Sequence, residues 1–473
     1  MEKLGIYVQV PFCQTKCTYC NFHTGVVASS RFAPYVEAVC REIRAHPELL
    51  RAAGVEWPGR LGRSDAARLQ EDGTTRGAAG KRPASPPGAG RAPGGPHVET
   101  TLAVDTVYIG GGTPSLLNPA HLGNILDAIQ ESFGRNRDHV NDLGKRQRRD
   151  AEDAEIRREE ENEPFASSAR PRQASGWPCV TQLEEVTLEA DPETVEAEKA
   201  AAWVRAGINR VSFGLQSFVD RELIAAGRMH RRADIYRAVP ILREAGIWNI
   251  SVDLIAGLPH QTKESWSQSL EELVAMTPEH VSVYLLEIDE GSRLGKELLQ
   301  GGAKYSAGAV PSEDQMAEFY EMAQEALGAA GYHHYEISNW AKPGFESRHN
   351  LKYWRREPYL GFGAGAHSFS GTERWANAHD AAGYVTAVQG GRLPVEQHEE
   401  LTTESALEEE LFLGLRQLDG IDLGRIEREY GVTLGARFDR IASAGLVERE
   451  GSLVRLAPEK LSVSNEVFVE LLR

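Results

Sequence analysis

Three cysteines lie close together near the start of the chain, at Cys13, Cys17 and Cys20. Their spacing, CxxxCxxC, places three thiols on one short loop, directly after an apolar run at residues 4–10 that predicts a β-strand. Cysteine thiolates bind soft metals and iron–sulfur clusters. A four-site centre held by three thiolates is one ligand short, which leaves one iron free for something other than protein.

Two other uses of these cysteines have to be weighed. The chain has five cysteines in 473 residues, an odd number, and no apolar N-terminal run typical of a secretory signal, so we expect no disulfides. Structural zinc is the second alternative. His23 follows Cys20 by three positions and would complete a Cys3His site.

The bulk composition excludes several classes of protein. Hydrophobic residues make up 41% of the chain, enough to build the cores of two or three domains. The net charge of −17 argues against a nucleic-acid binder, which needs a basic face. No stretch approaches the ~20 apolar residues of a membrane span. We therefore expect a cytoplasmic protein, peripheral at a membrane only through a protein partner, because an acidic surface does not favour anionic lipid.

Two segments differ in composition from the rest. Residues 59–100 are rich in Gly, Ala, Pro and Arg, and residues 134–178 contain a dense charge run followed by a polar stretch. Neither composition can bury enough apolar surface to offset the entropy of ordering. We predict that both are disordered insertions in surface loops, and that Cys179 at the edge of the second is incidental.

Outside these segments, strand and helix patterns alternate. A helix predicted at residues 32–46 carries Cys40 on its apolar face, which favours a core position for this cysteine. Strands are predicted at residues 4–10, 106–109, 185–190, 210–214, 249–254 and 280–286. Six β/α repeats predict an α/β fold with a parallel sheet forming a partial (β/α)6 barrel over residues 1–295.

The C-terminal part changes character. Residues 296–399 are predicted to be an extension associated with the barrel. Residues 400–473 are predicted to form a winged-helix-like domain, with helices at 405–417, 423–430 and 434–444 and then a hairpin. Winged helices often bind DNA. The 15 acidic and 9 basic side chains of this domain, a net charge of −6, favour a structural or partner-docking role instead.

Polar residues stand at the ends of the predicted strands, where parallel barrels collect their chemistry. The cysteine loop follows the first strand. The second is followed by the run GGGTPS at residues 110–115, whose glycines let the backbone approach a ligand closely. Later strands end at, or are followed by, Glu189, Gln216, Arg228 and Asp253. A buried salt-bridge network would explain any one of these residues, but a polar group at every strand end favours a ligand site.

Together these motifs resemble the radical SAM proteins of the HemN/HemW group. The matching segments are YVQVPFC (7–13), the CxxxCxxC, GGGTPS (110–115), FGLQS (213–217) and DLIAGLP (253–259). The resemblance covers nearly the whole chain outside the two insertions. It implies that Cys13, Cys17 and Cys20 hold a [4Fe–4S] cluster and that S-adenosylmethionine (SAM) chelates the fourth iron. SAM would thus supply the missing ligand.

The same resemblance implies further roles. The methionine end of SAM would be lined by Gly111, Gly112 and Thr113. Its methionine and ribose portions would be held by Glu189, Gln216, Arg228 and Asp253. Tyr7 would sit beside the cofactor, and Tyr19 would shield the cluster or flank the adenine. Gln9 stands where the family often has histidine, a departure that changes a hydrogen bond around the cluster rather than the cluster ligands.

The group contains two activities, and three features choose between them. The oxygen-independent coproporphyrinogen III oxidases carry a fourth cysteine two residues past the third, where this chain has Phe22. They also have an extension before the first strand, at which this chain begins. The run HNLKYW at residues 349–354 instead matches the HNxxYW motif of the HemW heme chaperones, and GAGAHS at residues 363–368 is also similar to that branch. We therefore expect a heme chaperone without oxidase activity, and we assign no catalytic residue.

The motif implies heme contact through four side chains: His349, Asn350, Tyr353 and Trp354. Imidazole is a common axial ligand of heme iron, and the aromatic rings offer flat faces to a macrocycle. Alternatively, His349 and Trp354 simply pack between the barrel and the C-terminal domain. His367 and His230 compete with His349 as the axial ligand. Expected partners are heme and heme-accepting proteins, including respiratory enzymes at the membrane, and a homodimer is compatible with this picture.

Two other functions stay open. A coproporphyrinogen oxidase would cleave SAM to a 5′-deoxyadenosyl radical and decarboxylate propionate side chains, which Phe22 and the HNxxYW run disfavour. A zinc-binding docking protein would use the three cysteines with His23. It would leave the polar strand ends without a role.

Overall fold

The computed structural model describes residues 3–21, 24–52, 103–133 and 183–472. Both predicted insertions, at residues 59–100 and 134–178, lie outside the described residues. So do Phe22, His23 and Cys179. The predictions made for them stay predictions.

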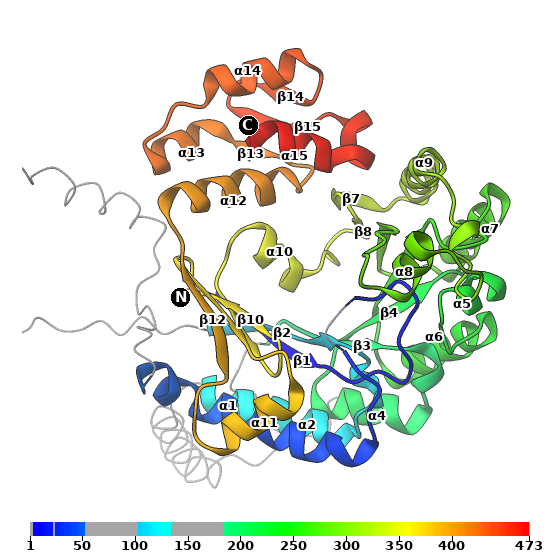
Figure 1. Ribbon diagram of the computed structural model, residues 1–473, viewed down its shortest axis with the longest axis vertical. Helices are drawn as coiled ribbons and strands as arrows, with labels where there is room; N and C mark the ends of the chain where they lie inside the picture. Colours follow the sequence, from blue (N-terminus) through cyan, green and yellow to red (C-terminus); the bar gives the residue numbers. More distant parts are fainter. Residues whose placement is uncertain (1–2, 22–23, 53–102, 134–182, 473) are drawn as a thin grey trace, which may run out of the picture.

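One twelve-stranded sheet organises the molecule, and six parallel strands form its centre (Figure 1). These are β1 (Lys3–Val10), β2 (Ala103–Gly111), β3 (Glu185–Ala190), β4 (Arg210–Gln216), β5 (Asn249–Ala256) and β6 (His280–Leu285). Each pairs in parallel with the next strand along the chain. The predicted α/β fold with its partial barrel is confirmed. The predicted strands differ from the observed ones only at their ends.

Helices cover the outer face of these strands (Figure 1). They are α1 (Phe32–Ala52), α2 (Pro119–Phe133), α4 (Ala197–Ala206), α5 (Asp220–Ala225), α6 (Arg232–Ala245) and α7 (Lys263–Met276). The apolar face predicted for α1 is confirmed, because Tyr35, Val39 and Ile43 are buried together with Cys40. Alternate residues of each strand supply the other half of this core, for example Ile6 of β1, which is completely buried.

Local sequence signals begin two of the helices. Thr262 Oγ1 accepts a hydrogen bond from the Ser265 backbone N–H at 3.2 Å, and Ser265 Oγ accepts one from the Thr262 N–H at 2.9 Å. This reciprocal capping box starts α7. Ser312 caps α9 (Glu313–Ala329) through the N–H of Gln315 in the same way. The caps satisfy backbone donors that the first helical turn leaves unpaired.

The sheet continues beyond the barrel strands at both edges, which sequence analysis did not predict. On one side β9 (Tyr359–Phe362) pairs in parallel with β1. The antiparallel strands that follow it are β10 (His367–Phe369), β11 (Glu373–Asn377) and β12 (Val395–Glu400). On the other side β6 is followed by β8 (Asn339–Ala341) and β7 (His333–Glu336). Residues of the predicted extension therefore add strands to the same sheet.

The inner face of the partial barrel is polar. Arg210, Ser251 and His280 alternate with the outward apolar residues of their strands and are each only 1% exposed. Ser251 Oγ lies 2.8 Å from His280 Nδ1, and the Tyr335 hydroxyl lies 2.7 Å from His280 Nε2. Buried polar groups need such partners. The barrel interior is therefore a hydrogen-bonded lining rather than an apolar core.

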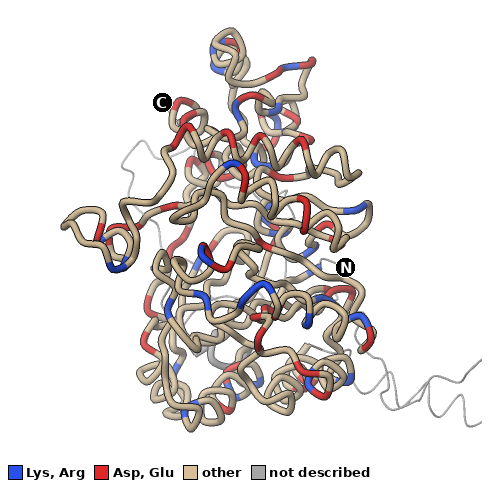
Figure 2. The backbone as a smooth tube through the Cα atoms, turned by 90° about the vertical axis from the view of Figure 1, so that its right-hand side faces the viewer, with Lys and Arg blue, Asp and Glu red and all other residues tan. Residues whose placement is uncertain are grey.

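The C-terminal residues form a separate layer of helices above α10 (Arg348–Trp354) in Figure 1. The predicted helices are present as α12 (Thr403–Leu415), α13 (Leu423–Tyr430) and α14 (Gly435–Ser443). The hairpin of β14 (Val447–Glu450) and β15 (Leu453–Leu456) follows, and the structure adds β13 (Ile421–Asp422) and α15 (Ser464–Leu472). On the side shown in Figure 2, acidic and basic residues alternate along this layer instead of forming a basic face.

Arg416 joins this layer to the barrel. Its guanidinium donates to Glu336 Oε1 from Nε at 2.8 Å, and Glu336 is completely buried. The same guanidinium lies 4.7 Å from the ring centroid of Trp354 in α10. One cation therefore neutralises a buried carboxylate and stacks on an aromatic ring of the predicted heme motif. Within the described residues, no helix combines the length and the apolar character needed to cross a membrane.

Replacing Arg416 with Met should lower the free energy of unfolding by about 2–4 kcal/mol, because the Glu336 carboxylate would stay buried without its cation. Urea unfolding followed by tryptophan fluorescence measures the change. Arg44→Met is the matched control, since Arg44 pairs with Glu131 where both side chains are about half exposed. It should change stability little. Equal losses in the two variants would contradict this account of the interface.

Candidate functional site

One cavity of about 1100 Å³ lies at the carboxyl ends of the barrel strands and reaches the C-terminal helices. All the residues predicted to hold the cluster and SAM line it: Tyr7, Cys13, Cys17, Tyr19, Cys20, Gly111, Gly112, Thr113, Glu189, Gln216, Arg228 and Asp253. They come from segments as far apart as β1 and β5. The parallel sheet therefore brings together the residues that sequence analysis assigned to one ligand site.

The cysteine loop is held by its backbone. The Cys13 N–H donates to the Gly25 carbonyl at 3.0 Å, which closes the loop on itself. Thr18, between the second and third cysteines, donates its N–H to the Ala226 carbonyl after α5 at 3.0 Å. Its carbonyl accepts the N–H of Leu294 in α8 (Arg293–Gln300) at 2.8 Å. Contacts with two separate helices thus fix where the thiols point.

The three thiols are free, half-buried and close enough to influence one another. Burial raises the pKa of Cys13, and the neighbouring Cys20 and Cys17 raise it further. The Arg228 guanidinium lies 3.4 Å from the Cys17 sulfur and forms an ion pair with Asp191. A buried cation at this distance favours the thiolate form of Cys17.

The zinc alternative gains no support from the described part of the chain. Among these residues, no group of three or more His, Cys, Asp or Glu side chains forms a site for a single metal ion. His23, the proposed fourth ligand, lies outside them.

The glycine-rich loop after β2 lies directly against the cysteine loop. The Gly112 N–H donates to the Val10 carbonyl at 2.8 Å, and the Thr113 N–H donates to the Phe12 carbonyl at 2.6 Å. A side chain on Gly112 would place its Cβ 2.4 Å from the Phe12 carbonyl oxygen. Glycine is therefore required for this close approach. The contact carries the β1–β2 pairing past the strand ends and into the site.

Gln216 has the features of a residue held for a ligand. It ends β4 with a φ of 70°, a left-handed conformation that is strained for a residue with a side chain. Its Oε1 atom is buried without a hydrogen-bond partner among the described residues. Unsatisfied buried acceptors are rare in folded proteins, and this one lines the cavity.

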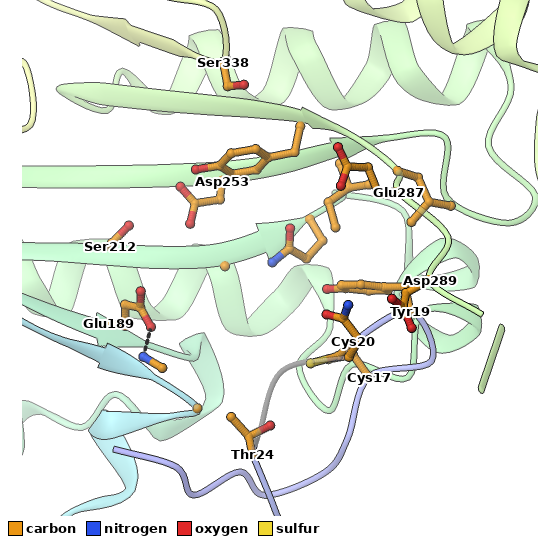
Figure 3. A pocket seen from close by; sticks show the side chains of 18 of the residues that line it. Cys17, Tyr19, Cys20, Thr24, Glu189, Ser212, Asp253, Glu287, Asp289 and Ser338 are labelled. Carbon is orange, nitrogen blue, oxygen red and sulfur yellow. Dashed lines mark hydrogen bonds between the residues drawn. The ribbon is translucent and has the colours of Figure 1, made fainter. Parts of the chain in front are cut away.

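Two carboxylic acids lie deeper along the strands (Figure 3). Figure 3 shows Glu189 and Asp253 with Ser212 on three neighbouring strands, and Cys17 and Cys20 beyond the strand ends. Burial raises the pKa of Glu189 to about 7, although it accepts hydrogen bonds from the Gly111 N–H and the Tyr108 hydroxyl, both at 2.9 Å. Burial also raises the pKa of Asp253 to about 6. Both acids would be stabilised by a ligand that carries positive charge.

The raised pKa of Glu189 predicts a pH dependence of stability. Its folded pKa of about 7 exceeds the ordinary 4.5, so its contribution is fully present below pH 4.5 and is lost as the pH rises through 7. Relative to Glu189→Gln, the wild-type protein should lose on the order of 2 kcal/mol of unfolding free energy over this window. Urea unfolding at about pH 5 and about pH 7.5 measures it.

Glu321→Gln is the control for that experiment, because Glu321 is exposed on α9. The difference between wild type and this control should be the same at both pH values. A pH-independent difference between wild type and Glu189→Gln would show that Glu189 does not titrate in this window.

The HNxxYW segment occupies α10, with its histidine turned away from the cavity. His349 is completely buried, with Nδ1 3.0 Å from Thr106 Oγ1 and Nε2 2.9 Å from the Tyr353 hydroxyl. Burial lowers the pKa of His349 to about 3. Of the four residues in the heme prediction, only Tyr353 lines the cavity, whereas Trp354 lies under Arg416. Packing, the alternative left open above, accounts for the positions of His349 and Trp354.

The two competing histidines differ in the same respect. His230 is completely buried, with Nε2 3.0 Å from the Leu215 carbonyl oxygen. His367 begins β10, is exposed, and lines the cavity.

Sequence analysis missed part of the lining. Asp191 was not assigned a role, yet it pairs with Arg228 and accepts a hydrogen bond from Thr113 Oγ1 at 3.1 Å. The available signal was its spacing of two from Glu189, which puts both on one side of an extended chain. The C-terminal layer contributes Leu461, Ser462, Ser464 and Asn465. No local sequence pattern marks these residues.

Comparison with known proteins agrees with this geometry. A family model described as the Radical SAM superfamily matches residues 100–273, and one described as the HemN C-terminal domain matches residues 401–459. The chain is 30% identical to heme chaperone HemW of Bacillus subtilis, over 98% of this chain and 97% of that protein. It is 32% identical to heme chaperone HemW of a Synechocystis species, over 88% of this chain and 78% of that protein.

A solved structure shares the architecture. Coproporphyrinogen III oxidase HemN of Escherichia coli superimposes with a TM-score of 0.69, over 99% of this chain and 90% of that chain. The two sequences are 18% identical, so this similarity shows the fold alone.

Proposed function

Because the chain belongs to the HemW heme chaperone family of radical SAM proteins, we propose that it binds a [4Fe–4S] cluster, SAM and heme, and delivers heme to heme-dependent proteins. The observation that carries this proposal is the single cavity, which gathers three thiols, a strained glutamine and buried acids. Cys13, Cys17 and Cys20 would hold the cluster.

The chemistry of the cysteine loop fits such a cluster. Three thiols are soft ligands on a fixed backbone, and Arg228 beside Cys17 offsets part of their negative charge. A cluster bound there would supply a redox-active iron with one coordination site open to a small molecule. Tyr19 packs against an apolar cluster that includes Ala226 and Leu258. In that position it restricts water at the loop.

The charges of the neighbouring wall fit SAM. SAM carries an ammonium and a sulfonium, which complement Glu189 and Asp253, and a carboxylate, which complements Arg228. The free Oε1 of Gln216 would accept a hydrogen bond from the ligand. Gly111, Gly112 and Thr113 let the backbone approach the methionine end. Tyr7 stacks 6.1 Å from Tyr108 and bounds the cavity on the β1 side.

Heme enters this proposal as cargo. The cavity extends past Tyr7 to Tyr353 of α10, whose hydroxyl is held by His349. We propose that α10 forms one wall of the heme site, with Tyr353 in contact and His349, Asn350 and Trp354 supporting it. The acidic chain and its alternating charges favour protein partners over lipid, so delivery to membrane respiratory enzymes would run through protein contacts in the cytoplasm.

The test of function is anaerobic reconstitution with iron and sulfide, followed by a heme titration and an assay for coproporphyrinogen decarboxylation. Tight heme binding without decarboxylated product supports a chaperone. Product formation with weak heme binding would instead identify an oxidase. Transfer of bound heme to an apo-hemoprotein, followed by absorbance, tests the delivery step.

Replacing Cys17 with Ala should abolish the cluster, because two thiolates from this loop would remain for four irons. Iron and sulfide analysis after reconstitution measures the loss. Cys40→Ala is the matched control, since Cys40 is 5% exposed in the core and donates to the Asn124 carbonyl at 3.4 Å. This variant should keep its full cluster content. Full iron and sulfide in Cys17→Ala would refute the assignment of the cluster.

A further inference from the structure

The cavity is large enough for more than SAM. Its volume of about 1100 Å³ exceeds the roughly 300–1000 Å³ of a typical single-ligand pocket. The residues suited to SAM come from β2 to β5 and the loops after them. On the other side of β1, the cavity is lined by Tyr353, Tyr359, Gly365, His367 and His379. This second region, which we call the β9–β10 chamber, has no role in the SAM site.

The β9–β10 chamber has the shape and chemistry of a site for a flat aromatic molecule. The Tyr353 and Tyr359 rings meet edge to face with their centroids 4.6 Å apart. Gly361, between them and β10, has no side chain to fill the space. A Cβ there would lie 2.1 Å from the His367 carbonyl oxygen. Aromatic walls around an open space favour a macrocycle over a small polar metabolite.

His367 is the imidazole that faces this chamber most openly. It is exposed, whereas His379 beside it is half-buried and His349 and His230 are completely buried. Both ring nitrogens of His349 lie within hydrogen-bond distance of a hydroxyl, so binding iron through His349 would require breaking one of these contacts. His367 needs no such rearrangement.

The backbone that carries His367 is held firmly. The turn before it donates the Gly363 N–H to the buried Glu42 carboxylate at 2.9 Å and the Ala364 N–H to the Tyr35 hydroxyl at 2.8 Å. Asn377 of β11 donates its N–H to the Ala366 carbonyl at 2.9 Å. A metal ligand on such a fixed backbone loses little freedom when it binds.

We propose that His367 is the axial ligand of heme iron and that the macrocycle occupies the β9–β10 chamber against Tyr353 and Tyr359. The proposal rests on the heme chaperone function proposed above and names the residue that function requires. It also separates heme from SAM, because β1 with Tyr7 and Gln9 lies between the two regions.

The test is a titration of the reconstituted full-length protein with ferric hemin, followed by Soret absorbance and electron paramagnetic resonance. His367→Ala should lose the histidine-ligated spectrum and bind hemin roughly tenfold or more weakly. Added imidazole should restore the spectrum by filling the empty position. Iron and sulfide content and binding of S-adenosylhomocysteine should not change, which shows that the variant is folded.

His379→Ala is the matched control, because it removes an imidazole from the same chamber. It should keep the wild-type spectrum, as should His349→Ala, whose affinity falls only through the loss of its contact with Tyr353. An unchanged spectrum and affinity in His367→Ala would overturn the proposal, as would loss of histidine ligation in either control variant. If the wild-type protein binds no hemin, the proposed function itself fails, a result recognisable before any variant is compared.

Discussion

The pairing of β1 with β2 is the constraint on which the rest of the site depends. Gln9 lies opposite Gly110 in this parallel pair, and the hydrogen bonds from Gly112 to Val10 and from Thr113 to Phe12 continue it into the loops. The cysteine loop and the glycine-rich loop are therefore one unit rather than two neighbouring segments. Any shift in register would move the thiols relative to every other wall of the cavity.

A polar barrel interior is the second constraint, and it changes how the HNxxYW motif is understood. A buried imidazole needs partners for both ring nitrogens. His349 finds them in Thr106 of β2 and in Tyr353, four residues along the same helix. The motif histidine therefore ties α10 to the sheet and sets the direction of the Tyr353 hydroxyl. A motif associated with a ligand can thus act by building the wall of a site while another residue touches the ligand.

The edges of the sheet and the C-terminal layer complete the cavity. Strands β9 and β10 extend the sheet past β1, and this addition brings His367 to the same opening as the cysteines. Arg416 locks the C-terminal layer onto buried Glu336 and onto Trp354. This arrangement accounts for residues 461–465 reaching the cavity although they follow the first cysteine by more than four hundred positions.

The sequence by itself determined the elements and the residues that carry chemistry. Apolar runs and helical periodicity are local properties, and they predicted the six parallel strands and α1, α7 and the C-terminal helices close to their observed bounds. The rule that parallel strands end at one edge was enough to predict that Cys13, Glu189, Gln216 and Asp253 share a site. The resemblance to a known family supplied their roles.

Only the tertiary structure decided which polar residues face the cavity and which are buried behind it. His349, His230 and His367 cannot be ranked from sequence, because exposure depends on the strands and helices that pack around each ring. The same holds for the sheet edges: β9 pairs with β1 across more than three hundred residues, and no local pattern encodes a partner at that separation. Burial and long-range pairing are properties of the whole fold, and they assign the histidine that meets the ligand.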